Sequence, residues 1–404
     1  MLPQREPAVP GQWREVARQA NLLAPDGTPA ATIFAEMSAL AVRTGAINLG
    51  QGFPDTDGPA SLLDDAVAAI RGGRNQYPPG RGVPELRAAV AAHQRHWYGV
   101  DVDPDTEVLV TAGATEAIAA SVMALCEPGD EVIMLEPYYD SYAAAVALAG
   151  AVRRTVPLSF PDYTLDVDRL AAAITARTRL LLLNTPHNPT GRVFGRAELE
   201  AVAQLAVRHD LTVIADEVYE HLTFDGAGHV PICTLPGMAD RTVTISSAGK
   251  TFSVTGWKVG WLHARRELVD AITTVKQFLT YVNAGPLQPA VARALELPDS
   301  YFAGAAAALQ AGRDVLIEGL LDAGFAVSRP AGTYFVVADA APLGFDDGLR
   351  LCLELPELAG LVAVPVRVFH DDVSAARSLV RFAFCKRPEV IAEACARLHR
   401  LGGR

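Results

Sequence analysis

The sequence predicts an α/β fold in which a mostly parallel sheet is covered by helices on both faces. From residue 107 onwards, short runs of β-branched residues and leucine alternate with alanine-rich helical stretches. Such alternation is typical of parallel sheets whose strands are joined by helices. The chain has 404 residues, more than one hydrophobic core usually supports, so a large domain and a smaller one are expected. Small and polar residues follow several predicted strands, at the edge of the sheet where ligands gather.

The first part of the chain divides into an arm and the predicted sheet. Residues 1 to about 30 are rich in Pro, Gly and Gln, which indicates an arm rather than a packed domain. Apolar residues at helical spacing predict a helix over Arg196–His209. The predicted strands are short apolar runs that suit a sheet buried on both faces: Glu107–Thr111, Glu131–Leu135, Arg179–Leu183, Leu211–Ala215, Val243–Ser246 and Val259–Leu262.

The last hundred or so residues have a different pattern. A long Ala/Leu helix is predicted over Tyr301–Gly324, followed by two strands around Phe325–Ala338, a strand at Leu379–Cys385 and a closing helix. This pattern predicts a smaller α/β domain that the N-terminal segment joins. The predicted division is an arm over 1–30, a small domain from 31–58 with 294–404, and a large domain over 59–293.

Composition excludes several classes of function. The chain carries 35 basic and 46 acidic residues, a formal net charge of −11, whereas nucleic-acid binding needs clustered Lys and Arg. Its five cysteines are scattered and include no Cys-x-x-Cys pair, which favours thiols in a reducing compartment over disulfides or zinc. No apolar run approaches the length of a membrane span. We therefore expect a cytoplasmic protein that binds neither nucleic acid nor membranes.

Lys250 is the first candidate for chemistry, because it follows a predicted strand among Ser, Ala and Gly residues. Small neighbours leave room for a bulky group, and a desolvated lysine has the lowered pKa that Schiff-base formation requires. Ser247 and Lys258 flank it and supply a hydroxyl and a second ammonium for a phosphate. Gly113–Thr115 opens a helix after another strand, where backbone N–H groups bind anions. Alone, Lys250 would be read as a surface lysine, and Gly113 would be read equally well as an ordinary turn.

Polar side chains after neighbouring strands suit an aromatic cofactor ring. Asp216 ends a strand and would pair with a protonated ring nitrogen. Tyr219 and Asn188 would reach a phenolic oxygen, and Tyr139 would stack on the ring, although each also suits ordinary packing or a turn. The sequence shows no convergent set of His and Asp residues, so it predicts no metal site. His93 and His96 share a helical face and are predicted to be surface residues.

Arg381 lies among apolar residues in the predicted strand Leu379–Cys385. A guanidinium in such a place is costly unless it meets a carboxylate, which it binds through two parallel hydrogen bonds. Arg381 is therefore predicted to bind a substrate carboxylate, with an internal salt bridge as the alternative.

Taken together, these residues resemble those of the fold-type I, class I/II aminotransferases, which depend on pyridoxal 5′-phosphate (PLP). The resemblance runs from about Thr32 to Leu401 and implies a mostly parallel seven-stranded sheet in the large, PLP-binding domain. The motifs that carry it are Asn48–Pro54, Asn75–Tyr77, His187–Gly191, Asp216–Tyr219 and Ser247–Lys258, in that order.

The resemblance assigns the catalytic and ring-binding roles residue by residue. Lys250 would form the Schiff base with PLP and later move the proton between the substrate Cα and the cofactor. Asp216 would keep the pyridinium nitrogen protonated, which makes the ring an electron sink. Tyr219 and Asn188 would bond the phenolic oxygen, and Tyr139 would stack on the ring.

The resemblance also implies a homodimer with composite active sites. Arg381 and Gly52 would bind the substrate α-carboxylate, and Phe34 would line the side-chain pocket together with Tyr281 of the partner subunit. Many relatives carry Arg where this chain has Lys258, which keeps the charge but loses the bidentate fork. The phosphate would be held by Gly113, Ala114, Thr115, Ser247 and Lys258, helped by Tyr77 of the partner subunit.

Within the family, the branch that shares a lysine at position 258 contains kynurenine aminotransferases, cysteine-conjugate β-lyases and methionine aminotransferase-like enzymes. Phe34–Leu40, Tyr77–Gly80 and Phe384–Arg387 most resemble bacterial N-succinyldiaminopimelate aminotransferases of lysine biosynthesis. The substrates implied are an amino acid and a 2-oxo acid, with 2-oxoglutarate and glutamate as the second couple. An acidic far end on the donor needs another cationic contact, for which Arg81, Lys276 and Arg367 are candidates.

Other functions stay open at the sequence level. They are transamination of kynurenine, methionine or glutamine, and β-elimination from cysteine conjugates. An aminotransferase-like regulator is disfavoured, because such regulators carry an N-terminal DNA-binding domain and nothing basic precedes the core here.

Overall fold

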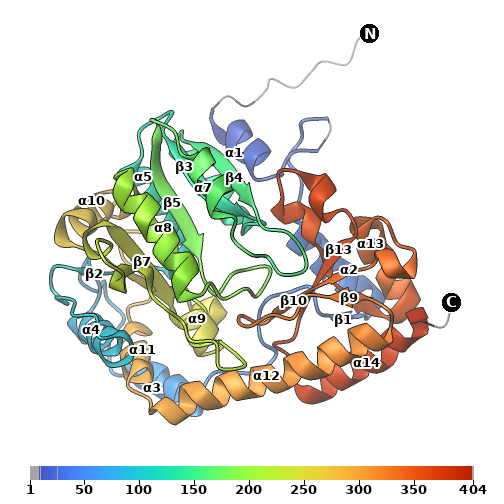
Figure 1. The fold of residues 1–404 in the computed structure, drawn as a ribbon. Helices are drawn as coiled ribbons and strands as arrows, with labels where there is room; N and C mark the ends of the chain where they lie inside the picture. Colours follow the sequence, from blue (N-terminus) through green and yellow to red (C-terminus); the bar gives the residue numbers. More distant parts are fainter. Residues whose placement is uncertain (1–8, 10, 25, 403–404) are drawn as a thin grey trace, which may run out of the picture.

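A computed structural model describes residues 9, 11–24 and 26–402 of the chain. Two sheets lie side by side, a large one built from residues 108–263 and a smaller one built from residues 326–383. Helix α12 (Asp299–Asp322) runs beneath both of them (Figure 1). This arrangement confirms the α/β class and the larger and smaller parts. The boundaries 31–58 with 294–404 and 59–293 stay a prediction.

The large sheet has seven strands in the order β2-β8-β7-β6-β5-β3-β4. Only β8 runs antiparallel to its neighbours, so the sheet is mostly parallel, as predicted. The strands are β2 (Val108–Ala112), β3 (Glu131–Glu136), β4 (Val152–Pro157), β5 (Thr178–Asn184), β6 (Thr212–Asp216), β7 (Thr242–Ser247) and β8 (Val259–His263). All predicted strands are confirmed to within a residue or so of their bounds, but β4 is an additional strand.

Alternate residues of each strand face opposite helical layers, because successive side chains point to opposite sides of a strand. In β5, Leu180 and Leu182 pack with α5, α6 and α10, whereas Leu181 and Leu183 pack with α8. Helices α3, α4 and α11 cover the end of the sheet at β2 and β8. The helices around this sheet are α3 (Ala60–Arg71), α4 (Pro84–Tyr98), α5 (Gly113–Leu125), α6 (Asp140–Leu148), α7 (Val167–Ala173), α8 (Arg196–Arg208), α9 (Ala248–Thr251), α10 (Arg266–Lys276) and α11 (Gln288–Leu295).

The smaller sheet has the order β12-β13-β10-β9, and a separate parallel pair joins β1 to β11. That pair joins the N-terminal segment to the C-terminal part of the chain. The strands are β1 (Ile47–Asn48), β9 (Ala326–Val327), β10 (Phe335–Asp339), β11 (Leu361–Val362), β12 (Val364–Pro365) and β13 (Leu379–Ala383). Helices α2 (Ile33–Thr44), α13 (Gly348–Ala359) and α14 (Pro388–Gly402) lie in this part of the molecule (Figure 1).

Short 3₁₀ turns complete the loops, at Ile232–Thr234, Ala239–Arg241, Thr255–Trp257, Ala341–Leu343, Val366–Phe369 and Val373–Ala376. The predicted arm contains a helix of its own, α1 (Trp13–Gln19), which contacts α6. Arg153 of β4 donates to the carbonyl of Gln19 at 3.1 Å. Residues 1–8, 10 and 25 of that arm lie outside the described residues.

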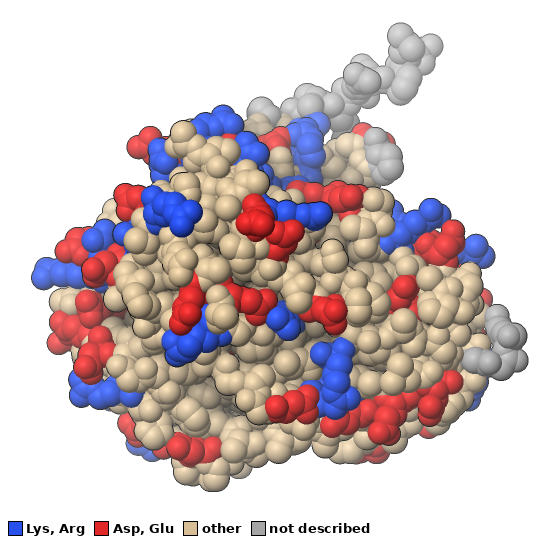
Figure 2. All heavy atoms as spheres, viewed as in Figure 1, with Lys and Arg blue, Asp and Glu red and all other residues tan. Residues whose placement is uncertain are grey.

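The surface mixes both signs of charge. On the face drawn in Figure 2, acidic and basic side chains are interspersed with broad uncharged areas. Within the described ranges no helix is long and apolar enough to cross a membrane.

Candidate functional site

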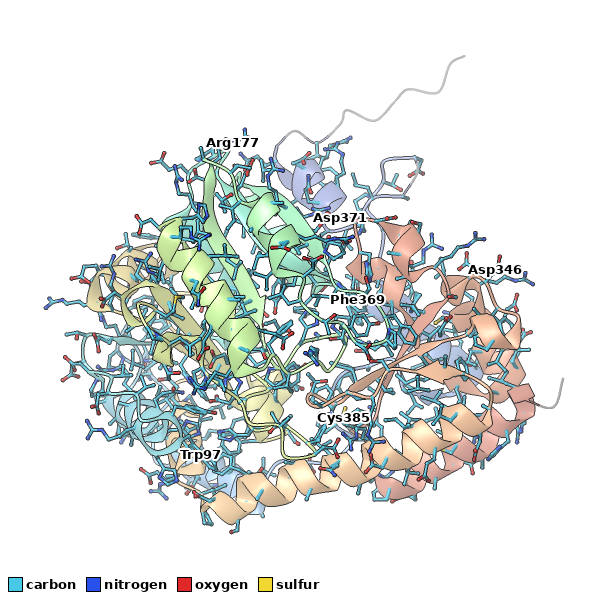
Figure 3. All side chains as sticks on the ribbon, viewed as in Figure 1. Trp97, Arg177, Asp346, Phe369, Asp371 and Cys385 are labelled. Carbon is cyan, nitrogen blue, oxygen red and sulfur yellow. The ribbon has the colours of Figure 1, made fainter. Side chains whose placement is uncertain are left out.

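A cavity of about 340 Å³ opens where the strands β5, β6 and β7 end and the smaller sheet begins. Figure 3 labels Phe369, whose side chain lies in the space between the two sheets. The cavity gathers residues from many segments of the chain because parallel strands present their carboxyl ends at one edge. The predicted site residues that line it are Phe34, Gly52, Gly113, Ala114, Thr115, Tyr139, Asn188, Asp216, Tyr219, Ser247, Lys250, Lys258 and Arg381.

Lys250 sits in the short helix α9, directly after β7. Its Nζ donates to the hydroxyl of Tyr334 at 3.0 Å and lies 5.6 Å from the ring centroids of Tyr219 and Tyr334. Burial lowers the pKa of the Lys250 ammonium to about 8, because an apolar surrounding disfavours the charged form. A substantial neutral fraction is the property that a nucleophilic lysine needs.

Asp216 ends β6 and is 5% exposed. The hydroxyl of Tyr142 donates to its Oδ2 at 2.6 Å, and the backbone N–H of Val218 donates to Oδ1 at 3.3 Å. Burial raises the pKa of this carboxyl despite both hydrogen bonds. A cationic ring nitrogen beside it would favour the ionised form.

The start of α5 forms an anion-binding cradle with the Lys258 segment. Lys258 Nζ lies 3.3 Å from Thr115 Oγ1. Gly113 has φ +71°, and a Cβ there would meet Lys258 Cε and Nζ at 3.3 Å. On the adjacent strand, a Cβ at Gly260 would approach the Gly113 carbonyl carbon to 2.5 Å. The absence of side chains therefore lets the backbone at the start of α5 approach the Lys258 ammonium closely, an arrangement that suits a phosphate.

Arg381 is 1% exposed and lies in β13. Nη1 donates to Asn188 Oδ1 at 3.0 Å and Nη2 to the Gly50 carbonyl at 3.1 Å, while Nε has no partner. Across the part of the chain that the structure describes, Arg381 forms no salt bridge, so the internal ion pair considered above is not found. Burial lowers the pKa of this guanidinium to about 10, and an unpaired buried cation would gain from a carboxylate ligand.

Aromatic rings surround this guanidinium. Its carbon lies 3.9 Å from the ring centroid of Phe335, 5.0 Å from that of Phe369 and 5.5 Å from that of Phe34. Gly52 packs directly on Phe335, where a Cβ would approach to 2.5 Å. The rings form an apolar wall, and the edge of the guanidinium is the polar feature of that wall.

Tyr77 and Tyr281 do not line the cavity of their own chain. Their rings pack against each other at 5.5 Å, and the residues are 81% and 42% exposed. Their predicted roles across a dimer interface stay a prediction.

The three candidates for an extra cation also lie outside the cavity. Arg81 pairs with Asp270 and Arg367 with Asp347 at 3.2 Å. Lys276 is buried and donates to the carbonyls of Gly80 and Tyr281.

Sequence reasoning missed several residues that hold the site together. Tyr142 bonds Asp216, Tyr334 bonds Lys250 and the carbonyl of Gly52, and Asn184 bonds the backbone of Asn188 and Asp216. Asn184 and Tyr142 both follow strands, and that position was a usable signal. Tyr334 precedes β10 in the distant C-terminal part, so nothing local pointed to it.

His93 was predicted to be on the surface, and this prediction is wrong. It is 4% exposed and its Nε2 lies 2.8 Å from Nε2 of His221. Glu220 joins these two residues in one cluster, so the structure brings together a set of ligand-type residues that the sequence did not predict. His96, one turn further along α4, is exposed as predicted.

Comparison with known proteins agrees with this geometry. Residues 44–398 match the family model for aminotransferases of class I and II. The chain is 54% identical over 386 residues to the probable N-succinyldiaminopimelate aminotransferase DapC of Mycobacterium tuberculosis, covering 93% of this chain and 97% of that one. It is 39% identical over 370 residues to the methionine aminotransferase of Escherichia coli, covering 92% and 96%. The solved N-succinyldiaminopimelate aminotransferase from Mycobacterium tuberculosis superimposes with a TM-score of 0.92 at 52% identity, covering 98% of this chain and 100% of that one.

Proposed function

Because the chain belongs to the class I and II aminotransferases, we propose that it binds PLP beside Lys250 and moves an amino group from an amino acid to a 2-oxo acid. Bound PLP supplies a protonated aromatic ring that takes up negative charge from the substrate Cα. The observation that carries the proposal is a single cavity lined by a desolvated lysine, a buried carboxylate, an anion cradle and an unpaired arginine.

Each group has a separate task in this proposal. Lys250 Nζ attaches the cofactor and afterwards carries the proton that leaves Cα. Asp216 keeps the ring nitrogen protonated, and Tyr142 and Val218 hold its two oxygens in place. The Tyr334 hydroxyl, 3.0 Å from Nζ, orients the amine. Tyr219 and Asn188, which line the cavity, would contact the ring oxygen, and Tyr139 would stack on the ring face.

Separate parts of the cavity bind the cofactor phosphate and the substrate α-carboxylate. Lys258, Ser247 and Gly113–Thr115 hold the cofactor phosphate at the start of α5. Arg381 binds the α-carboxylate through the guanidinium edge whose Nε has no protein partner. One site then serves donor and acceptor in turn, since both an amino acid and a 2-oxo acid carry that carboxylate.

We further infer that the enzyme is an isologous homodimer, in which Tyr77 and Tyr281 of each chain complete the cavity of the other. The support is an exposed apolar cluster, formed by Tyr77, Phe278, Leu279 and Tyr281, with exposures of 81%, 85%, 44% and 42%. Large side chains exposed together in this way mark interaction surfaces. A reducing, cytoplasmic location is supported by five free cysteines.

N-succinyl-L,L-diaminopimelate is the amino donor that we propose, with 2-oxoglutarate as acceptor. The support is the 54% identity to a relative with that name. The cavity's own cations are Lys250, Lys258 and Arg381, and each already has a task. The acidic far end of this donor would therefore be recognised by groups of the partner subunit.

Methionine is the second candidate donor, because the wall near Arg381 is formed by aromatic rings and a methionine aminotransferase is among the relatives. The test is a donor panel with 2-oxoglutarate, followed by mass spectrometry of the keto products. We expect succinylated diaminopimelate to exceed methionine, kynurenine and glutamine at least tenfold in kcat/KM. Turnover of methionine or kynurenine without turnover of the succinylated donor would refute the proposed substrate.

The same assay separates transamination from β-elimination. We expect at most one equivalent of the 2-oxo acid product per site from cysteine conjugates, and sustained turnover only when a 2-oxo acid acceptor is present. Pyruvate and ammonia released without an acceptor would instead assign the enzyme to β-elimination.

A further inference from the structure

Three side chains of metal-ligand type converge at a place that the proposed reaction does not use. His93 comes from α4, and Glu220 and His221 come from the segment after β6. Their ligand atoms all lie within 4.8 Å of one another, and none of the three lines the cavity around Lys250. Trp97, labelled in Figure 3, marks this corner of the molecule beside α4. Its ring centroid is 4.8 Å from that of His221.

Glu220 is a buried carboxylate that lies among the imidazoles of His93, His221 and His229. It is 4% exposed, and its Oε1 accepts a hydrogen bond from Ser246 Oγ at 2.6 Å. Its Oε2 has no hydrogen-bond partner, and among the described residues no Lys or Arg forms a salt bridge with it. A buried charge in this situation is costly unless a cation neutralises it.

Other ionisable groups lie around this cluster. A second buried carboxylate, Glu217, lies near Glu220 and pairs with His229 at 2.8 Å. Two imidazoles and a carboxylate at this spacing are a donor set that suits a metal ion.

We propose that His93 Nε2, His221 Nε2 and a Glu220 oxygen bind one Zn²⁺ ion. Two imidazoles with one carboxylate form a common zinc ligand set, and a water molecule completes a tetrahedron. The imidazole nitrogens are 2.8 Å apart, and tetrahedral zinc would hold them about 3.3 Å apart. A separation of roughly half an ångström more is within the reach of small side-chain rotations.

Such an ion would join α4 to the segment that is bonded to β7, the strand just before the reactive lysine. Glu220 is bonded to Ser246 in β7, and Lys250 follows that strand within a few residues. The ion would be structural, because it lies outside the cavity, and it would stabilise the folded state by mass action.

The test is metal binding by the PLP-loaded protein after treatment with a chelator and dialysis. Equilibrium dialysis against Zn²⁺, followed by elemental analysis, should give one ion per chain. Glu220→Gln keeps the hydrogen bond from Ser246, and His93→Gln keeps a polar side chain, so each should fold and weaken binding at least tenfold. His96→Gln is the matched control, because His96 lies on the same helix but is exposed and pairs with Asp299. It should bind Zn²⁺ as tightly as the parent does.

A second measurement needs no ligand variant. Co²⁺ added to the parent protein should give the intense visible bands of a tetrahedral site without sulfur, and should quench Trp97. The Trp97→Phe protein should show the same bands with the quenching removed. Failure to bind Zn²⁺ or Co²⁺, or stoichiometric binding that survives both Glu220→Gln and His93→Gln, would show that the two imidazoles simply share a proton. Because the readouts are metal content and cobalt spectra, the outcome is independent of the proposed donor.

Discussion

At the scale of single residues, Lys250, Asp216 and Arg381 share one property, which is that each is shielded from water without an opposite charge at hydrogen-bond distance. Burial lowers the pKa of Lys250 to about 8 and that of Arg381 to about 10, and it raises the pKa of Asp216. Each shift is toward the neutral form, as desolvation requires. A phosphorylated ring cofactor and a carboxylate substrate supply the missing charges, so binding should relieve these costs.

The lowered pKa of Lys250 predicts how the PLP-free protein takes up its cofactor. The neutral amine is the nucleophile, so the attachment rate should rise with pH and level off above about 8. Each unit of pH below that value should slow it about tenfold. Stopped-flow absorbance at saturating PLP measures this profile, and a rate that falls as pH rises would contradict it.

Lys250→Ala should abolish the visible absorbance and turnover while circular dichroism stays unchanged.

Arg381→Lys tests the carboxylate contact with the charge retained. Lysine cannot form the bidentate pair and would lose the bonds to Asn188 and Gly50. One lost charge-assisted hydrogen bond corresponds to about tenfold to a hundredfold in kcat/KM. Arg367→Lys is the control, since Arg367 pairs with Asp347 outside the cavity. Equal kinetics for the two variants would remove Arg381 from the substrate site, and unchanged PLP absorbance in both would show intact cofactor binding.

At the scale of secondary-structure elements, substitution of Gly113 at the strand–helix junction should have a larger effect than its positive φ alone would cause. Gly113 and Gly99 have nearly equal φ values, +71° and +66°. A Cβ at Gly113 would press on Lys258, whereas a Cβ at Gly99 meets nothing within 4 Å. Alanine at either site should cost about 1 kcal/mol of stability, but only Gly113→Ala should weaken PLP binding. Thermal unfolding and cofactor titration separate these effects, and equal PLP affinities would exclude the steric argument.

Strands made of consecutive apolar residues could be predicted from the sequence, whereas a strand that also carries charged residues could not. The apolar run Leu180–Leu183 of β5 is buried on both faces, so its sequence predicts a strand. Strand β4 begins Val152-Arg153-Arg154 and lies at the sheet edge, where charged residues are tolerated. Its arginines pair with Asp371 and Glu131, and neither partner is visible from local sequence. His93 was misplaced for the same reason, because its partner His221 is distant in the chain.

At the scale of the whole molecule, most of the site could be predicted because cofactor contacts follow strand ends, and strand ends can be read from a sequence. Asp216, Lys250 and Gly113 belong to this class. Contacts supplied by distant segments depend on how the two sheets are set against each other. Tyr334 and Arg381 both come from the smaller sheet region, and only Arg381 was found, because a charge among apolar residues is conspicuous whereas a tyrosine is not.

The dimer proposal predicts that two defective chains can rebuild one working site. In a hybrid of Lys250→Ala and Tyr77→Phe chains, the intact Lys250 would face an intact Tyr77 of the partner subunit. If the differently tagged chains are co-expressed and pair at random, about a quarter of all sites should be restored, since half the dimers are hybrid with one complete site each. Purified hybrids should then exceed both parent homodimers in turnover at limiting PLP, where loss of the Tyr77 hydroxyl matters most. Sites built from a single chain would gain nothing from pairing, so hybrid activity equal to the mean of the two parents would exclude a composite site.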